Sequence, residues 1–265
     1  MKKISIFAVA LAAVAFTSCG GNKSANEAEK AEKSFEQEQV EAKIKQEIDS
    51  LSAEIAKLKK LPILEFGEEG FQLTEQEKQV KPDYLLSPSV AENAITLAEK
   101  YRALSALCVD KQIAALYDMP TDEYQAAIAK LAADIDDPSF KEIDDVSNIH
   151  ETSQKLYDAM NANGRINYFW QMVAGSLIEE FYVMTNNSDK FITAFDDESA
   201  TLTTFRIVLL NEAVDRLASY DPEFESVAKV TETLAPLDAI TVDQLKAQLE
   251  EAKEKVAETR NELIK

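Results

Sequence analysis

The feature that most constrains this sequence is the regular spacing of apolar residues over long segments without helix breakers. No glycine or proline occurs from Glu27 to Lys60. Five apolar residues in that stretch recur at alternating spacings of four and three: Ile44, Ile48, Leu51, Ile55 and Leu58. This heptad seam is typical of a long amphipathic helix. A second seam occurs near the C-terminus: Leu245, Leu249, Ala252, Val256 and Leu263. We therefore expect a long helix near each end of the chain.

Helical periodicity also dominates the sequence between the two seams. It predicts helices over residues 88–117, 121–135, 138–164 and 165–184, with further helices after residue 188. Residues 165–184 are apolar on most sides, as expected for a helix at the centre of a domain. Gly67, Gly70 and Pro82 interrupt the pattern, and they predict a long connector over residues 61–86. The predicted fold is therefore all-α.

The two seams bear on how the helices are arranged. We expect one single antiparallel helical bundle in which the helices of residues 27–60 and 241–264 pack together like a coiled coil. Alternatively, the seams could pair helices from different copies of the chain in an intermolecular coiled coil. Both arrangements would bury the apolar stripes.

The N-terminal residues resemble the precursor of a bacterial lipoprotein. Lys2 and Lys3 precede an apolar run of thirteen residues, Ile4 to Phe16, which is too short to span a bilayer as a stable helix. The run leads into the sequence Phe16-Thr17-Ser18-Cys19-Gly20, which resembles the lipobox. The resemblance implies cleavage before Cys19 and transfer of a diacylglyceryl group to its thiol. We therefore expect a signal peptide (residues 1–18), a tether (19–26) and one all-helical domain (27–265).

This resemblance also implies a location in the cell envelope. In Gram-negative lipoproteins, a Gly such as Gly20 after the acylated cysteine implies passage to the outer membrane, and it leaves open which face carries the protein. Acyl chains contribute about 0.8 kcal/mol per buried methylene, so they hold a protein without a basic patch. The net charge of −20 disfavours both nucleic-acid binding and electrostatic docking on anionic lipids. Membrane contact is expected through the lipid alone.

The sequence contains no catalytic or metal-binding motif that we recognise. His150 is the only histidine, which excludes any site with two imidazoles. The acidic segment Asp134 to Asp145 lacks the glycine and the bidentate glutamate of a calcium loop, so helix capping explains it better. Cys108 lies in an apolar run and is interpreted as a core residue. Phosphate-binding glycine loops and Gly-x-Ser-x-Gly elbows are also missing. We expect no cofactor, no metal and no catalytic residue.

Two carboxyl groups stand out because they interrupt the most apolar predicted helix. An ionised Glu179 or Glu180 inside the core would need a partner or would stay protonated. Arg165, Arg206 and Arg216 are the candidate partners. Adjacent helix positions point about 100° apart, so the two glutamates cannot form a catalytic dyad by themselves. A structural buried ion pair, or a solvent-facing Glu180, is the favoured interpretation.

The same helix carries a second resemblance. The segment Gly175-Ser176-Leu177-Ile178-Glu179-Glu180-Phe181-Tyr182 is similar to a Gly-x-Trp-Ile-Glu-x-Leu-Tyr type of segment in uncharacterised all-helical lipoproteins of Gram-negative bacteria. We expect Gly175 to permit close helix packing, and Glu179 and Tyr182 to form a buried polar contact. The candidate ligand or buried polar site is therefore made of these four residues: Glu179, Tyr182, Arg165 and Arg206.

The sequence thus favours a non-enzymatic scaffold or binding role for a lipid-anchored helical protein. Its partner could be a protein, a peptide or a small ligand, and the heptad helices could also mediate self-association. One alternative is a hydrolase or other enzyme that uses Glu179 and Tyr182. Another is a helical lipoprotein that binds metal cations.

Overall fold

The computed structural model describes residues 35–58, 61–64, 71–149, 151–218 and 221–264. The predicted signal peptide, the lipidation residue Cys19 and the tether lie outside these residues. Most of the described residues are helical and none forms a β-strand, which confirms the predicted all-α class. Within the same residues, every helix is too short or too polar to cross a lipid bilayer.

Eleven α-helices and four 3-10 turns make up the described part of the chain. The α-helices are α1 (Phe35–Lys57), α2 (Glu75–Lys78), α3 (Val90–Asn93), α4 (Leu97–Leu116), α5 (Asp122–Ile135), α6 (Ser153–Ala162), α7 (Ile166–Asn186), α8 (Ser188–Phe191), α9 (Asp197–Leu217), α10 (Phe224–Leu234) and α11 (Val242–Leu263). The 3-10 turns are η1 (Pro62–Leu64), η2 (Pro138–Glu142), η3 (Val146–Asn148) and η4 (Ile192–Ala194).

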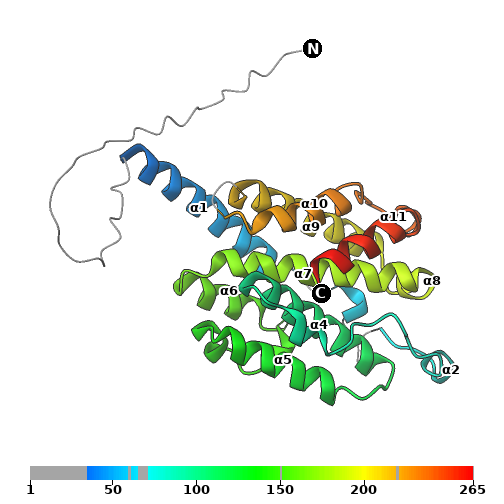
Figure 1. The fold of residues 1–265 in the computed structure, drawn as a ribbon. Coiled ribbons are helices and arrows are strands. Elements are labelled where there is room, and N and C mark those ends of the chain that lie inside the picture. The colour runs from blue at the N-terminus through cyan, green and yellow to red at the C-terminus, as the bar shows by residue number, and fades with distance from the viewer. Residues whose placement is uncertain (1–34, 59–60, 65–70, 150, 219–220, 265) are drawn as a thin grey trace, which may run out of the picture.

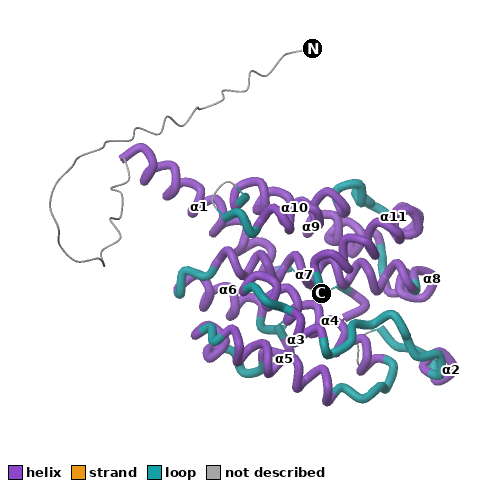
Figure 2. Tube along the Cα trace, in the orientation of Figure 1, coloured by secondary structure: helices purple, strands orange, loops and turns teal. Residues whose placement is uncertain are grey.

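Helix α7 runs through the middle of the molecule, as the sequence predicts (Figure 1). It packs against α4 and α6 on one side and against α9, α10 and α11 on the other. Helix α5 covers the outer side of α4 (Figure 2). Fifteen residues of α7 are buried, and they include aromatic and aliphatic side chains on all sides of the helix. A helix with this composition is stable only when neighbours surround it.

The contact between α4 and α7 is the most extensive helix pair in the fold, and it depends on Gly175. A Cβ atom at Gly175 would lie 2.6 Å from the carbonyl oxygen of Arg102 and 2.6 Å from Oγ of Ser105. Only a residue without a side chain allows the two backbones to approach so closely. The expected role of Gly175 is therefore confirmed.

The two terminal helices do not pair in the way that the seams suggest. Helix α1 packs against α6 and α9, whereas α11 packs against α7 and α10. The seam of α11 is buried in this contact, and the α1 seam is buried or half-buried. The predicted pairing of the first and last helices is wrong because either seam fits any apolar surface of the right width. The heptad pattern defines a stripe but does not specify its partner.

Some helix boundaries also differ from the predicted ones. Helix α4 begins at Leu97 rather than near residue 88, because Thr96 caps it: the Thr96 side chain accepts from the N–H of Glu99, and the Glu99 side chain accepts from the N–H of Thr96. The segment before it forms the separate short helix α3. Between residues 138 and 164, the described residues form two 3-10 turns and α6 instead of one helix.

Candidate functional site

A buried ion pair crosses from α7 to α11. The guanidinium of Arg260 donates from Nε to Oε2 of Glu179 at 2.9 Å and from Nη2 to Oε1 at 3.0 Å. Glu179 is 0% exposed and Arg260 is 7% exposed. This two-point geometry is the strongest arrangement of an arginine and a carboxylate. It joins the central helix to the C-terminal helix.

Asp110 of α4 brings a second carboxyl group to the same pair. Its Oδ2 accepts from the backbone N–H of Leu86 at 2.6 Å, and the Leu86 carbonyl accepts from the hydroxyl of Tyr124 at 3.0 Å. The charge of Glu179 also acts on the Asp110 carboxyl group. We call Asp110, Glu179 and Arg260 the core charge cluster. It connects α4, α7 and α11 with the connector that precedes α3.

Burial controls the protonation of the core charge cluster. Desolvation raises the pKa of Asp110 well above its ordinary value of 3.8, and the charge of Glu179 adds to this shift. Burial also raises the pKa of Glu179, although Arg260 opposes the increase through hydrogen bonds and charge. One guanidinium balances only one carboxylate. Asp110 therefore retains its proton at pH values where exposed aspartates are ionised.

Tyr182 and the arginines that the sequence singled out do not all lie beside Glu179. Tyr182 is half-buried, and the Arg260 guanidinium lies 4.4 Å from the centre of its ring. Glu179 and Tyr182 thus share a contact with Arg260, in place of the predicted direct contact between them. Arg165 precedes α7 and lies over the ring of Tyr168. The predicted partners of Glu179 are therefore wrong, because its partner is Arg260.

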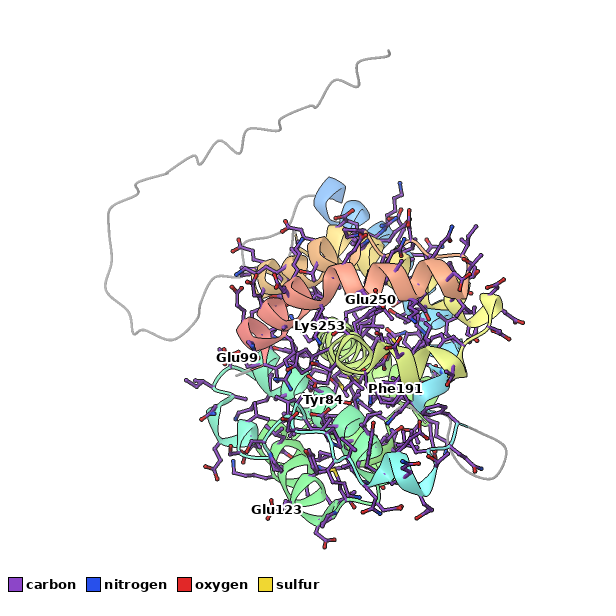
Figure 3. The ribbon with its side chains drawn as sticks, turned by 90° about the vertical axis from the view of Figure 1, so that its right-hand side faces the viewer. Tyr84, Glu99, Glu123, Phe191, Glu250 and Lys253 are labelled. Carbon is purple, nitrogen blue, oxygen red and sulfur yellow. The ribbon has the colours of Figure 1, made fainter. Side chains whose placement is uncertain are left out.

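Figure 3 looks along α7 and shows what lies above and below this helix. In this view α11 lies above α7, with Glu250 and Lys253 on it. Tyr84, from the connector, lies below α7. The rings of Tyr84 and Tyr182 meet edge to face, with their centres 6.3 Å apart. The Tyr182 ring thus contacts both Tyr84 and the guanidinium of Arg260.

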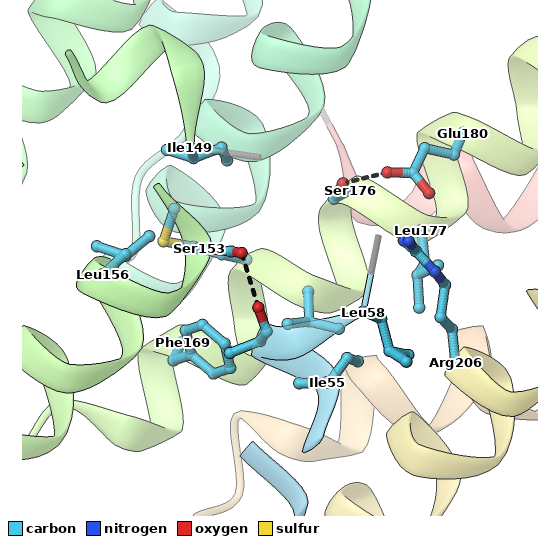
Figure 4. Close-up of a pocket in the computed structure, with 13 residues that line it drawn as sticks. Ile55, Leu58, Ile149, Ser153, Leu156, Phe169, Ser176, Leu177, Glu180 and Arg206 are labelled. Carbon is cyan, nitrogen blue, oxygen red and sulfur yellow. Dashed lines mark hydrogen bonds between the residues drawn. The ribbon is translucent and has the colours of Figure 1, made fainter. Parts of the chain in front are cut away.

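A pocket with a volume of about 90 Å³ lies on the opposite part of α7, between α1, α6, α7 and α9 (Figure 4). Its wall is predominantly apolar, with a polar end on one side. The lining residues are Ile55, Ala56, Leu58, Ile149, Ser153, Leu156, Phe169, Met172, Val173, Ser176, Leu177, Glu180 and Arg206. We call this space the α1–α9 pocket.

The polar end of the α1–α9 pocket contains the second predicted glutamate. Glu180 is 1% exposed, and its Oε1 accepts from the hydroxyl of Ser176 at 2.8 Å. The half-buried Arg206 extends from α9 toward this end of the pocket (Figure 4). Burial raises the pKa of Glu180, whereas the charge of Arg206 and the Ser176 hydrogen bond lower it. Glu180 does not face solvent, so that alternative is wrong. Arg206 acts on Glu180 rather than on Glu179.

Helix α1 forms one side of the α1–α9 pocket and is fixed there by polar contacts. The indole N–H of Trp170 donates to Oγ of Ser52 at 2.8 Å, and Ser52 donates to the Ile48 carbonyl at 2.7 Å. Ser153 donates to the Ala56 carbonyl at 3.0 Å beside the pocket (Figure 4). These bonds connect α1 with α6 and α7. They hold the end of α1 next to the pocket.

The remaining reactive residues have structural surroundings. Cys108 is 0% exposed, and burial raises the pKa of its thiol, which opposes formation of a reactive thiolate. Asp137 and Asp145 cap 3-10 turns by accepting from the N–H groups of Ser139 and Ser147, so the capping interpretation of this segment is confirmed. Among the described residues, no group of three or more potential ligands is arranged to hold a metal ion. His150 lies outside these residues.

Sequence reasoning missed two members of the core charge cluster, although the sequence contains a signal for each. The α11 seam runs through Val256 to Leu263 and lacks an apolar residue one turn after Val256. Arg260 occupies that position, four residues after Val256, and so points into the core. Asp110 interrupts the apolar α4 in the same way as Glu179 interrupts α7. A charged residue at an expected core position predicts a buried ionic partner elsewhere.

Comparison of the chain with protein-family models, with curated proteins and with solved structures finds no match. Function is therefore inferred from the geometry of the two polar sites. The core charge cluster is buried, and within it Arg260 binds both oxygens of Glu179. The α1–α9 pocket is a space of about 90 Å³ with charged groups at one end.

Proposed function

We propose that this chain is a lipid-anchored protein of the Gram-negative cell envelope, held at the outer membrane, with a non-enzymatic binding role. The anchoring part of this proposal rests on the sequence around Cys19. The binding part rests on one observation, which is the α1–α9 pocket. An apolar wall combined with a few polar groups at one end is the usual composition of a small-ligand site.

The other roles have less structural support. Both heptad seams pack inside the body, so they are not surfaces on which an intermolecular coiled coil would readily form. An enzyme that uses Glu179 would need this carboxylate to reach a substrate. Glu179 is 0% exposed and both of its oxygens accept from Arg260. These contacts favour ligand binding in the pocket over self-association or catalysis.

Native mass spectrometry of the full chain, purified in detergent from its membrane, tests the binding role. Val173 lines the pocket, so the larger side chain of Val173→Phe should fill part of it. Val208, at 44% exposed on the outer face of α9, provides the matched control Val208→Phe. We expect a non-covalent adduct on the wild type and on the control, and its loss from Val173→Phe. An adduct that persists in Val173→Phe, or its absence from the wild type, contradicts the proposal.

A further inference from the structure

Asp110 is a buried carboxyl group whose neighbouring guanidinium is committed to another carboxylate. Its side chain is 0% exposed. Arg260 donates from Nε and Nη2 to Glu179, and from Nη1 to the side chain of Asn261 at 3.3 Å. The Oδ1 atom of Asp110 is buried, and among the described residues no donor reaches it in hydrogen-bond geometry. An ionised Asp110 would be poorly stabilised there, because a buried carboxylate needs a cation or several donors.

Residues 84–86 of the connector contact this carboxyl group, and we call them the latch. The backbone N–H of Leu86 donates to Oδ2 of Asp110 at 2.6 Å, and the Leu86 carbonyl accepts from the hydroxyl of Tyr124 at 3.0 Å. The ring of Tyr84 packs edge to face against a tyrosine of α7. The latch lies between α2 and α3 and is not helical. Its position therefore depends on side chains of α4, α5 and α7.

Among the described residues, titratable or charged groups face Asp110 from each side of the cluster. They are Glu179 of α7, Arg260 of α11, Tyr124 of α5 and Tyr84 of the latch. Glu179 opposes ionisation of Asp110, whereas Arg260 favours it. Burial raises the pKa of both tyrosines, so they stay neutral and add no charge. Burial and the charge of Glu179 together keep Asp110 neutral while the latch is closed.

We propose that the latch is controlled by one proton: it stays closed over neutral Asp110 and opens when Asp110 loses that proton. Water reaches Oδ2 of Asp110 only after the N–H of Leu86 moves away from it, because the two atoms lie 2.6 Å apart. An open latch lets water solvate the carboxylate, so ionisation and opening occur together. The opening is local, since Arg260 keeps both of its bonds to Glu179. It requires no ligand in the α1–α9 pocket.

The opening equilibrium should depend on pH with a defined sign and slope. The ordinary pKa of an aspartate is 3.8, and burial under the closed latch raises the pKa of Asp110 well above this value. Between these two pKa values, the closed form holds a proton that the open form has lost. The equilibrium constant for opening therefore rises about tenfold per pH unit in this window and levels off above it. High pH opens the latch, and low pH closes it.

Hydrogen–deuterium exchange of the Leu86 amide in the full chain tests the latch, because this N–H is protected while it donates to Asp110. Rates at a series of pH values are corrected for the intrinsic pH dependence of amide exchange. In the wild type, the corrected protection of Leu86 should fall about tenfold per pH unit within the window. Asp110→Asn keeps an acceptor for Leu86 but cannot ionise, so it should abolish this dependence. Glu179→Gln removes the charge that opposes ionisation, so the fall should end at a lower pH.

The amide of Leu210 separates opening of the latch from unfolding of the whole body. Leu210 is 0% exposed in α9, so its amide should stay more protected than that of Leu86 at every pH. If both amides lose protection together, loss of the proton unfolds the body and no separate latch exists. If the corrected protection of Leu86 is independent of pH, or depends on pH equally in Asp110→Asn, Asp110 does not control the latch and the proposal is wrong.

Discussion

Substitution of Arg260 by methionine is the most demanding test of the fold. Arg260 is 7% exposed and donates two hydrogen bonds to Glu179, which is 0% exposed. Arg260→Met retains most of the apolar length of the side chain, but it leaves a buried carboxylate without a cation. Removal of one partner from a buried pair costs about 3–5 kcal/mol of unfolding free energy. For a domain of this size, the midpoint of thermal unfolding should fall by roughly 6–20 °C.

The assay is urea unfolding followed by far-ultraviolet circular dichroism, with an exposed ion pair as the control. Lys229 and Glu262 form such a pair on the surface, with side chains 58% and 56% exposed, so Lys229→Met should change stability by less than about 1 kcal/mol. The double variant Glu179→Met/Arg260→Met should be more stable than Arg260→Met, because it no longer buries an unpaired Glu179. A loss in Arg260→Met as small as that in Lys229→Met would refute the reasoning.

Substitutions of Asp110, Gly175 and Cys19 test three other parts of the molecule. Burial raises the pKa of Asp110, so folded wild type retains a proton that the unfolded chain loses above about pH 4. The unfolding free energy of the wild type should therefore fall as pH rises through the folded pKa of Asp110, by up to about 1.4 kcal/mol per pH unit. Urea unfolding at a series of pH values should show a weaker pH dependence for Asp110→Asn, and an equal pH dependence contradicts this. Gly175→Ala places a methyl group 2.6 Å from the Arg102 carbonyl and should cost about 1–3 kcal/mol in the same assay, whereas unchanged stability would argue against the close α4–α7 contact. Cys19→Ser should abolish labelling by radioactive palmitate and release the protein from the membrane fraction; a labelled variant would exclude Cys19 as the acylated residue.

The all-α class and the central helix could be predicted because they depend on local patterns. Few glycines, a helical period and a helix that is apolar on most sides leave little alternative to a helical fold with α7 inside. The partners of α1 and α11 could not be predicted, since an amphipathic stripe fits several surfaces. The start of α4 was also missed, because the capping box at Thr96 and Glu99 lies inside a stretch that reads as continuous helix.

The candidate sites show the same division between local and long-range information. The sequence predicted that Glu179 would need a buried partner, and the structure supplies one. That partner, Arg260, lies 81 residues away, and only tertiary packing brings the two together. Arg206 was one of three candidate partners for the two glutamates, and the sequence could not tell that it lies in one pocket with Glu180 rather than beside Glu179. Residue type indicates that a charge needs a partner, whereas the order of the helices in space determines which partner it finds.

The most direct test of the binding function is isothermal titration calorimetry with octanol on three forms of the full chain. The wild type and Val208→Phe, which alters an exposed part of α9, should bind octanol in a saturable way with one site per chain. Val173→Phe, which fills part of the α1–α9 pocket, should bind octanol at least tenfold more weakly, because its larger side chain takes the space of the ligand. A tenfold loss corresponds to roughly 1.4 kcal/mol of binding free energy. Equal binding by all three forms, or no saturable heat from the wild type, would contradict the proposal that this pocket is the ligand site.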